Sequence, residues 1–174
     1  MILAIDPGLA ACGWAVVDPA TALVAELGVL TTEPDKAIAK STDRARRAHQ
    51  LAAQLAELAA VHGCTVLAAE AMLLFGNVNA ATAQVLCWGA LLGVAHARGL
   101  SVVEVRAKDW QHDVVGPGKV NYARVEKKLT KHVGPRIGAI AKNLRTHALD
   151  AVAIGLYAAL RKVPAVVKGA ACRA

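Results

Sequence analysis

Two acidic residues of this sequence each end an apolar run. Asp6 follows the run 2–5 and precedes a Pro-Gly pair, and Glu70 ends the run that begins at Cys64. Apolar runs without polar alternation are typical of strands covered on both faces, and buried carboxylates are rare unless they are paired or metal-bound. Asp-Pro-Gly is also an ordinary turn sequence. Asp6 is therefore a functional candidate only if other reactive side chains meet it.

A further pair of reactive side chains, His147 and Asp150, lies near the C-terminus. Residues 145–160 are predicted to be helical, and a spacing of three places both side chains on one helix face. Asp150 lies between Leu149 and an apolar run, so it is difficult to explain as a surface residue. A histidine near a helix start is more often satisfied or solvent-facing, so for His147 both interpretations stay open.

Three carboxylates and one imidazole are a plausible donor set for divalent metal ions. Mg²⁺ prefers oxygen ligands and keeps several waters, and two such ions can hold the attacking water and the departing oxygen of a phosphodiester. Imidazole suits Mn²⁺ better than Mg²⁺. His147 could therefore be a metal ligand, or it could orient or deprotonate the water.

The pattern of strands and helices brings the two strand-end acids together. The apolar stretches predict an antiparallel meander of three strands, at residues 2–6, 12–18 and 23–30. A helical period follows, with Ser41 or Thr42 as N-cap and Gly63 as the stop. The chain then returns through strand 64–70. Such a crossover is right-handed and lays this strand parallel to the first, so Asp6 and Glu70 are expected at the same sheet edge.

The remaining elements complete an α/β domain with a five-stranded mixed sheet, three strands antiparallel and two parallel, flanked by helices. We expect a helix over 77–98, a strand over 100–105, a basic helix over 121–132, a loop over 134–143 and the final helix. The helix 77–98 is rich in Ala and Gly, which favours either a subunit contact or packing on its own sheet. One domain over residues 1–162 and a flexible tail over 163–174 are expected.

Basic residues are concentrated in one quarter of the chain. Between Arg106 and Arg145 there are ten Lys or Arg against three acids, an excess of seven that equals the net charge of all 174 residues. A smaller basic cluster spans residues 36–47. This clustering suits a polyanion such as nucleic acid, although solvated helix faces explain it equally well.

The composition also sets limits. No window holds about 18 uninterrupted apolar residues, and no basic region precedes an apolar one at the N-terminus. We therefore expect a cytoplasmic protein without a membrane span. The four cysteines have no short paired spacing, so neither a zinc site nor a disulfide framework is indicated.

Four segments resemble the RuvC family of Holliday junction resolvases. They are Ile-Leu-Ala-Ile-Asp6-Pro-Gly-Leu, Ala-Ala-Glu70, Val-Val-Gly-Pro-Gly-Lys119 and His147-Ala-Leu-Asp150-Ala-Val-Ala-Ile-Gly-Leu. Each segment is weak alone, but all four occur in the order and spacing of the family, and the resemblance covers about residues 1–160.

The resemblance implies a ribonuclease H-like fold that works as a homodimer on a four-way DNA junction. Each subunit would cut one strand by metal-dependent hydrolysis, with Asp6, Glu70 and Asp150 as metal-binding carboxylates. His147 stands where many members carry Asp, and it is kept as a catalytic residue and metal ligand. Mg²⁺ is the expected cofactor, two ions per site, with Mn²⁺ able to substitute and favoured by His147. Branch-migration machinery is a candidate partner.

The family also suggests DNA contacts. Phe75 is a displaced substitute for a family aromatic that stacks on a junction base, because an ungapped comparison places Leu73 there. Lys119 is expected to steady phosphate charge in catalysis. The residues expected to contact DNA are Phe75, Asn77, Arg106, Lys108, Lys119, Arg124, Lys127 and Lys128.

Two alternatives remain open. A nuclease of the same fold could act on other branched DNA or on structured RNA, and competition among such substrates would separate these activities. A junction-binding architectural protein could have lost catalysis, with His147 as the first change. Stabilisation of the fold by Mn²⁺ would favour an intact site over the second alternative.

Overall fold

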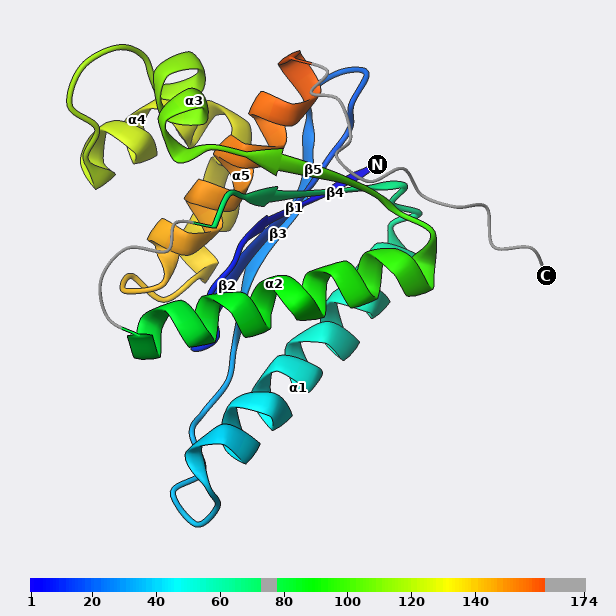
Figure 1. The fold of residues 1–174 in the computed structure, drawn as a ribbon. Coiled ribbons are helices and arrows are strands. Elements are labelled where there is room, and N and C mark those ends of the chain that lie inside the picture. Colours follow the sequence, from blue (N-terminus) through cyan, green and yellow to red (C-terminus); the bar gives the residue numbers. More distant parts are fainter. Residues whose placement is uncertain (73–77, 162–174) are drawn as a thin grey trace.

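The computed structural model describes residues 1–72 and 78–161, which form a five-stranded sheet with helices on both faces (Figure 1). The strand order is β3-β2-β1-β4-β5. The strands are β1 Ile2–Asp6, β2 Ala11–Val17, β3 Val24–Thr31, β4 Val66–Glu70 and β5 Ser101–Val105. The longer helices are α1 Lys40–Val61, α2 Val78–Arg98, α4 Tyr122–Val133 and α5 Arg145–Arg161.

The sheet has the predicted mixed topology. β1, β2 and β3 pair antiparallel, whereas β4 pairs parallel to both β1 and β5. The register places Asp6 opposite Gly13 on β2 and Glu70 opposite Val105 on β5. Because β1 and β4 are parallel neighbours, Asp6 and Glu70 lie at the same edge of the sheet, as predicted.

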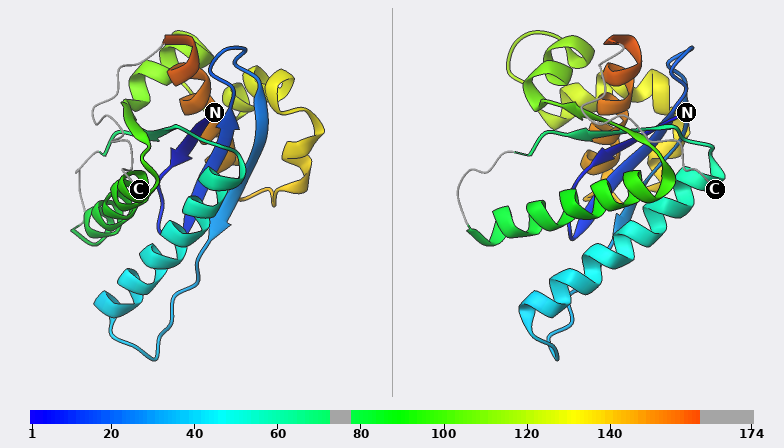
Figure 2. Two further views of the ribbon diagram at one scale, coloured as in Figure 1. Left: turned by 90° about the vertical axis from the view of Figure 1, so that its right-hand side faces the viewer. Right: turned by 45° about the vertical axis from the view of Figure 1, so that its right-hand side comes forward.

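Two separate cores cover the two faces of the sheet. On one face α5 packs with residues such as Ala4 and Ala15, while on the other α1 and α2 pack on Leu3 and Ile5 (Figure 2). Successive residues of β1 therefore face opposite cores, which explains why its sequence is apolar without alternation.

Small residues let α5 lie close to the sheet. A Cβ atom on Gly155 would come within 2.6 Å of Val17 Cγ2 and 2.9 Å of Ala4 Cβ. A Cβ on Gly13 would come within 1.9 Å of the carbonyl oxygen of His147. Glycine at these two positions fixes the depth at which α5, and with it His147, sits against β1 and β2.

Several predicted boundaries need correction. Helix α1 begins at Lys40 with Ala39 as its N-cap and no side-chain cap, so the prediction of Ser41 or Thr42 was wrong. The predicted loop after α4 contains a 3-10 helix, η2 Gly134–Ala139. Between β5 and α4 the short helix α3 Ala107–Trp110 continues into a π-helix, η1 Gln111–Val115. The predicted tail 163–174 lies outside the described residues.

Helix α2 is long and apolar enough to cross a membrane by length and composition, and it is the one such helix among the described residues. Its inner side contributes Trp88 and Leu91 to the core, and α2 also packs along α1. Its other side exposes Val85 and Leu92. One side of α2 therefore packs on the domain, and its other side is apolar and exposed.

We predict that Gly155→Ala lowers the free energy of unfolding by roughly 1 to 3 kcal/mol, because the added methyl overpacks the contact between α5 and the sheet. Urea unfolding measures the change. Gly138→Ala is the matched control, since a Cβ at Gly138 meets nothing within 4 Å. Equal stability of the two variants would contradict the predicted close packing.

Candidate active site

The four predicted site residues meet at the carboxyl end of β1 and β4. Asp6 and Glu70 end these strands, and His147 and Asp150 lie in the first turns of α5. Nδ1 of His147 lies 2.7 Å from Oδ2 of Asp6, a hydrogen bond between residues 141 positions apart. The His147 side chain remains 39% exposed, so the imidazole is accessible from solvent.

Mutual repulsion and burial link the acids electrostatically. Burial, together with the charges of Asp6 and Glu70, raises the pKa of Asp150 to about 7, and nearby His147 opposes part of this shift. Burial also raises the pKa of Glu70, with a smaller contribution from Asp6. The hydrogen bond to Asp6 raises the pKa of His147. These couplings place the three carboxylates and the imidazole in one charge cluster.

Two tryptophans hold Glu70, and the sequence analysis did not identify either of them. Nε1 of Trp110 donates to Oε1 of Glu70 at 3.0 Å, and Nε1 of Trp88 donates to the Glu70 backbone oxygen at 3.1 Å. Both rings are buried. A buried indole N–H normally finds an acceptor, and this is the one sequence signal that could have suggested the contacts.

A polar network braces the loop that follows Asp6. The hydroxyl of Thr32 donates to the Leu9 oxygen, and Nε of Arg47 donates to the Thr32 hydroxyl oxygen at 2.7 Å. Arg47 also pairs with Asp43 at 3.7 Å. Thr32 and Asp43 are both buried, so this network ties α1 to the loop at the site. It joins segments distant in sequence, and no local pattern predicted it.

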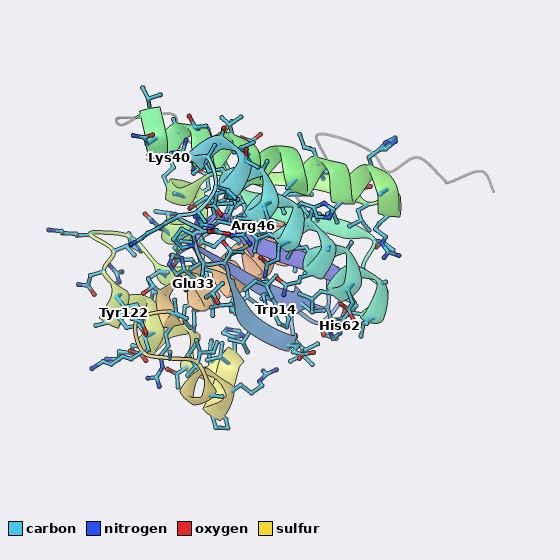
Figure 3. The ribbon with its side chains drawn as sticks, turned by 90° about the horizontal axis from the view of Figure 1, so that it is seen from below. Trp14, Glu33, Lys40, Arg46, His62 and Tyr122 are labelled. Atoms are coloured by element: carbon cyan, nitrogen blue, oxygen red, sulfur yellow. The ribbon has the colours of Figure 1, made fainter. Side chains whose placement is uncertain are left out.

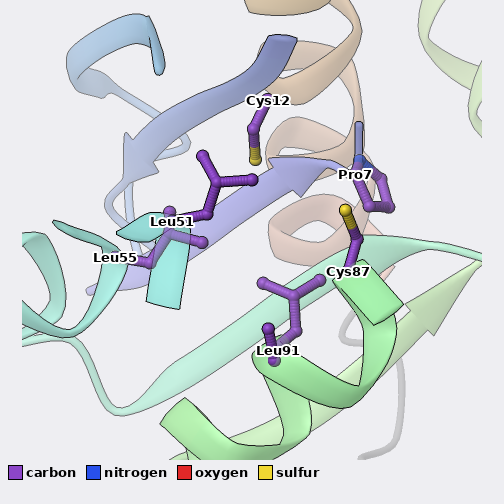
Figure 4. Close-up of a pocket in the computed structure, with 7 residues that line it drawn as sticks. Pro7, Cys12, Leu51, Leu55, Cys87 and Leu91 are labelled. Carbon is purple, nitrogen blue, oxygen red and sulfur yellow. The ribbon is translucent and has the colours of Figure 1, made fainter. Parts of the chain in front are cut away.

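The space beside Pro7 is a small apolar cavity rather than a second site. It has a volume of about 10 Å³, and Cys12 and Cys87 face it together with Leu51 and Leu55 (Figure 4). Burial raises the pKa of Cys12 to about 12 and that of Cys87 to about 11, so both thiols are protonated near neutral pH. Neither is an activated nucleophile. Cys12, Cys64 and Cys87 are free, as expected, and Cys172 lies outside the described residues.

The donor chemistry of the charge cluster fits a divalent cation. Glu70 and Asp150 are partly desolvated, and the charge of Asp6 contributes to their raised pKa values, so the three carboxylates offer negative charge that a cation would neutralise. Within residues 1–72 and 78–161, however, no three His, Cys, Asp or Glu side chains are arranged to hold a metal ion. One oxygen of Asp6 is occupied by the His147 contact. The residue types therefore fit a metal, while the hydrogen bond between Asp6 and His147 sets the side-chain arrangement that the structure shows.

Arg124 has a structural contact where a DNA contact was predicted. It donates from Nη2 to the Pro117 oxygen at 2.6 Å and from Nη1 to the Lys119 oxygen at 3.3 Å. Arg124 therefore holds the turn that carries Lys119, and positive φ at Gly116 and Gly118 lets the turn form. Lys119 itself is exposed.

The other residues predicted to contact DNA lie on two elements. Arg106 and Lys108 are exposed just after β5, next to the strand that ends in Glu70, and Arg106 pairs with Asp109 at 2.7 Å. Lys127 and Lys128 are exposed on α4. The predicted contacts Phe75 and Asn77 lie outside the described residues.

The fold and the site define a class. A five-stranded mixed sheet whose antiparallel meander continues into parallel strands, with acids at the ends of β1 and β4 and on α5, is a ribonuclease H-like domain. Residues 2–158 match the family model of crossover junction endodeoxyribonuclease RuvC. The chain belongs to the RuvC family.

Individual relatives agree with this assignment. RuvC of Erythrobacter litoralis is 30% identical over 131 residues, covering 74% of this chain and 77% of the relative. RuvC of Hyphomonas neptunium is 29% identical over 172 residues, covering 98% of this chain and 96% of the relative. The second of these alignments spans nearly the whole of both chains.

Solved structures show the same fold. RuvC of T. thermophilus in complex with a Holliday junction substrate has a TM-score of 0.73 at 20% identity, covering 92% of this chain and 93% of that one. The yeast mitochondrial Holliday junction resolvase Ydc2 has a TM-score of 0.61 at 14% identity, covering 92% of this chain and 80% of that one.

We predict that Asp150→Asn stabilises the metal-free protein at about pH 8, on the order of 2 kcal/mol. A raised pKa means that the folded state binds more protons than the unfolded state between about pH 4 and pH 7, so stability falls as pH rises through this window. The gain should be largest above pH 7 and absent below about pH 4. Denaturant unfolding with a chelator measures it.

Asp113→Asn is the control, because the pKa of Asp113 is shifted in the opposite direction to that of Asp150. Hydrogen bonds from His112 and Arg161 hold the pKa of Asp113 below its ordinary value, so its removal should not stabilise the protein at high pH. Equal effects of the two substitutions, or no gain for Asp150→Asn at high pH, would contradict the raised pKa of Asp150.

Proposed function

We propose that this chain, a crossover junction endodeoxyribonuclease by family, resolves Holliday junctions by paired hydrolysis of two phosphodiester bonds, one in each subunit of a homodimer. The observation that carries the assignment of the site is the cluster of three carboxylates at the ends of β1 and β4 and on α5, in which Glu70 and Asp150 are partly desolvated. Such a cluster suits a reaction at a phosphate, because bound cations would offset the negative charges of both the carboxylates and the phosphate.

Asp6, Glu70 and Asp150 are the residues that would hold divalent metal. The family is divalent-metal-dependent, and we propose Mg²⁺ as the ion, two per site, with Mn²⁺ as a substitute that the imidazole favours. When bound, the metal supplies an activated water and offsets charge on the phosphate. Trp110 keeps one oxygen of Glu70 engaged at 3.0 Å, which limits how that carboxylate can turn.

His147 is proposed as the residue that handles the proton of the attacking water. With Nδ1–H donating to Asp6, neutral imidazole leaves Nε2 as an acceptor. The hydrogen bond raises the pKa of His147, which makes the imidazole a stronger base toward this proton. The same contact holds the His147 imidazole against Asp6.

The proposed DNA surface is made of exposed cations around the strand ends. Lys108 follows β5, Lys119 lies on the turn that Arg124 holds, and Lys127 and Lys128 lie on α4. Arg124 is proposed to act through that turn. Their positive charges would release counterions from a bound phosphate backbone. The four-way junction is the proposed substrate.

A groove between α1 and α2 is the proposed homodimer contact. It has a volume of about 680 Å³ and is lined mainly by alanine, glycine and valine. Val85 is 47% exposed, and a Cβ on Gly89 or Gly93 would meet nothing within 4 Å, so a second backbone can approach closely. Two subunits are needed to cut two strands in concert, which favours a second copy of this chain as the occupant.

Three further expectations remain proposals. The nuclease domain is expected to span residues 1–162 with 163–174 as a tail, and the DNA substrate favours a cytoplasmic location. Branch-migration machinery is a candidate partner that would present junctions to the homodimer.

We predict that Asp6→Asn lowers the rate of four-way junction cleavage at least about 100-fold, because charge stabilisation at a metal site is worth several kcal/mol. Single-turnover cleavage of a synthetic junction in Mg²⁺ and in Mn²⁺ measures the rate. Binding should persist, because the substitution removes a negative charge near the phosphates.

The outcomes separate the alternatives. Wild-type protein that binds the junction but cuts nothing in either metal would support the architectural alternative, for which the Asp6–His147 contact is the specific structural argument. Equal cleavage of junction, plain duplex and structured RNA would contradict junction selectivity.

We predict that Val85→Glu weakens self-association by at least about tenfold, since a charge would be buried in the apolar groove. Sedimentation velocity measures the monomer–dimer equilibrium. Leu160→Glu is the matched control, because Leu160 is 65% exposed on α5 and does not line the groove. A wild type that stays monomeric, or equal weakening by both variants, argues against this contact.

A further inference from the structure

A basic notch lies at the start of α1, beside the loop that follows Asp6. It has a volume of about 340 Å³, and its cationic lining residues are Lys40, Arg44 and Arg47. Leu9 and Ala10 form part of its wall, so it borders the segment that leads away from Asp6. Because each residue spans at most about 3.6 Å, Ala10 lies within about 15 Å of Asp6.

Two cations in the notch converge on one neutral acceptor. Nη2 of Arg44 donates to Oδ1 of Asn79 at 3.0 Å, and Nζ of Lys40 donates to the same oxygen at 3.3 Å. Figure 3 shows Lys40 on the first turn of α1, near the start of α2, with Arg46 further along α1. Two positive charges sharing one amide oxygen repel each other, and an amide offers no charge to offset this repulsion.

The nearby acid neutralises other cations. Asp43 pairs with Arg46 at 2.7 Å and with Arg47 at 3.7 Å. Across the described parts of the chain, no carboxylate pairs with Lys40 or Arg44 within 4.0 Å. The two cations on Asn79 are therefore the uncompensated charges of the notch, and they are the groups available to an anion.

We infer that Lys40, Arg44 and Asn79 form a phosphate-binding notch for the DNA strand that enters the active site, at a phosphodiester a few nucleotides from the one that is cut. This inference rests on the proposed function. A phosphodiester oxygen would accept from both cations where the amide oxygen now does, and Arg44 can donate two N–H groups to one phosphate.

The position of the notch gives it a specific task. Arg47 joins the notch to Thr32, which holds the Leu9 oxygen. A phosphate bound in the notch would therefore be held at a fixed position relative to the loop that follows Asp6. The notch would set how far the strand advances across the charge cluster, which is a positioning role and not a catalytic one.

The salt dependence of junction binding tests the inference. For Arg44→Ala the slope of log K against log salt should become shallower by about 1, and for Lys40→Ala/Arg44→Ala by about 2, with affinity lower by about tenfold or more for the double variant. The single-turnover rate at saturating protein should also fall, by about tenfold in the double variant, because the strand is no longer held at a fixed position across the charge cluster.

Arg98→Ala is the matched control. Arg98 is exposed on the same helix as Asn79 but 19 residues further on, about 28 Å along the axis. The Arg98→Ala substitution removes one positive charge far from the notch, so the slope of log K against log salt should stay nearly unchanged. Arg44→Lys keeps the charge and should restore most of the slope, which separates a phosphate contact from a folding defect.

Ethylation of single phosphates identifies the contact directly. With wild-type protein, one ethylated phosphate near the cut should interfere with binding, and this interference should disappear in Arg44→Ala and persist in Arg98→Ala. If Arg44→Ala keeps the wild-type slope and interference pattern while the wild type cuts junctions, the notch is overturned alone. A wild type that binds no DNA overturns the notch and the proposed function together.

Discussion

Electrostatic repulsion among the desolvated carboxylates of Asp6, Glu70 and Asp150 is the constraint on which the rest of the site depends. Held together without a counterion, such groups cost folding free energy, and the surrounding packing must offset that cost. The offset comes from a sheet buried on both faces and from α5, whose residues Ala148–Leu156 are almost entirely buried except Asp150. The packing that stabilises this domain lies next to the site. It offsets the repulsion between the acids, so the site itself can remain charged.

The sequence predicted the sheet and its acids because both signals are local. An apolar run identifies a strand, its last residue lies at the sheet edge, and crossover handedness decides which edge. The contacts of Glu70 were not predictable in this way, since Trp110 lies 40 residues away, on the short helix α3 that precedes the π-helix η1. The start of α1 was misplaced because the prediction assumed a side-chain cap. The helix begins at Lys40, with Ala39 as N-cap and no side-chain hydrogen bond there.

Counting cations overestimated the surface available to DNA. Arg136 donates to the Val24 and Ala25 oxygens of β3 and to the C-terminal carbonyls of α4, and so covers a sheet edge. Arg124 holds a turn and Arg47 holds a loop. Several arginines of the basic segments therefore satisfy backbone carbonyls, because guanidinium offers five donors in a fixed plane. Most of the lysines are exposed, so their charges are more available to DNA than those of these arginines.

Helix α2 links the proposed subunit contact to the chemistry. Its inner side contributes Trp88, which donates to the Glu70 backbone, and its first turn contributes Asn79, which holds Lys40 and Arg44. Inserting α2 into a membrane would break these contacts and uncover β4, so its exposed apolar side is better explained by a second protein surface. A partner packed along that side would restrict the same helix that supports Glu70 and the basic notch. Association and the geometry of the site are therefore expected to depend on each other through α2.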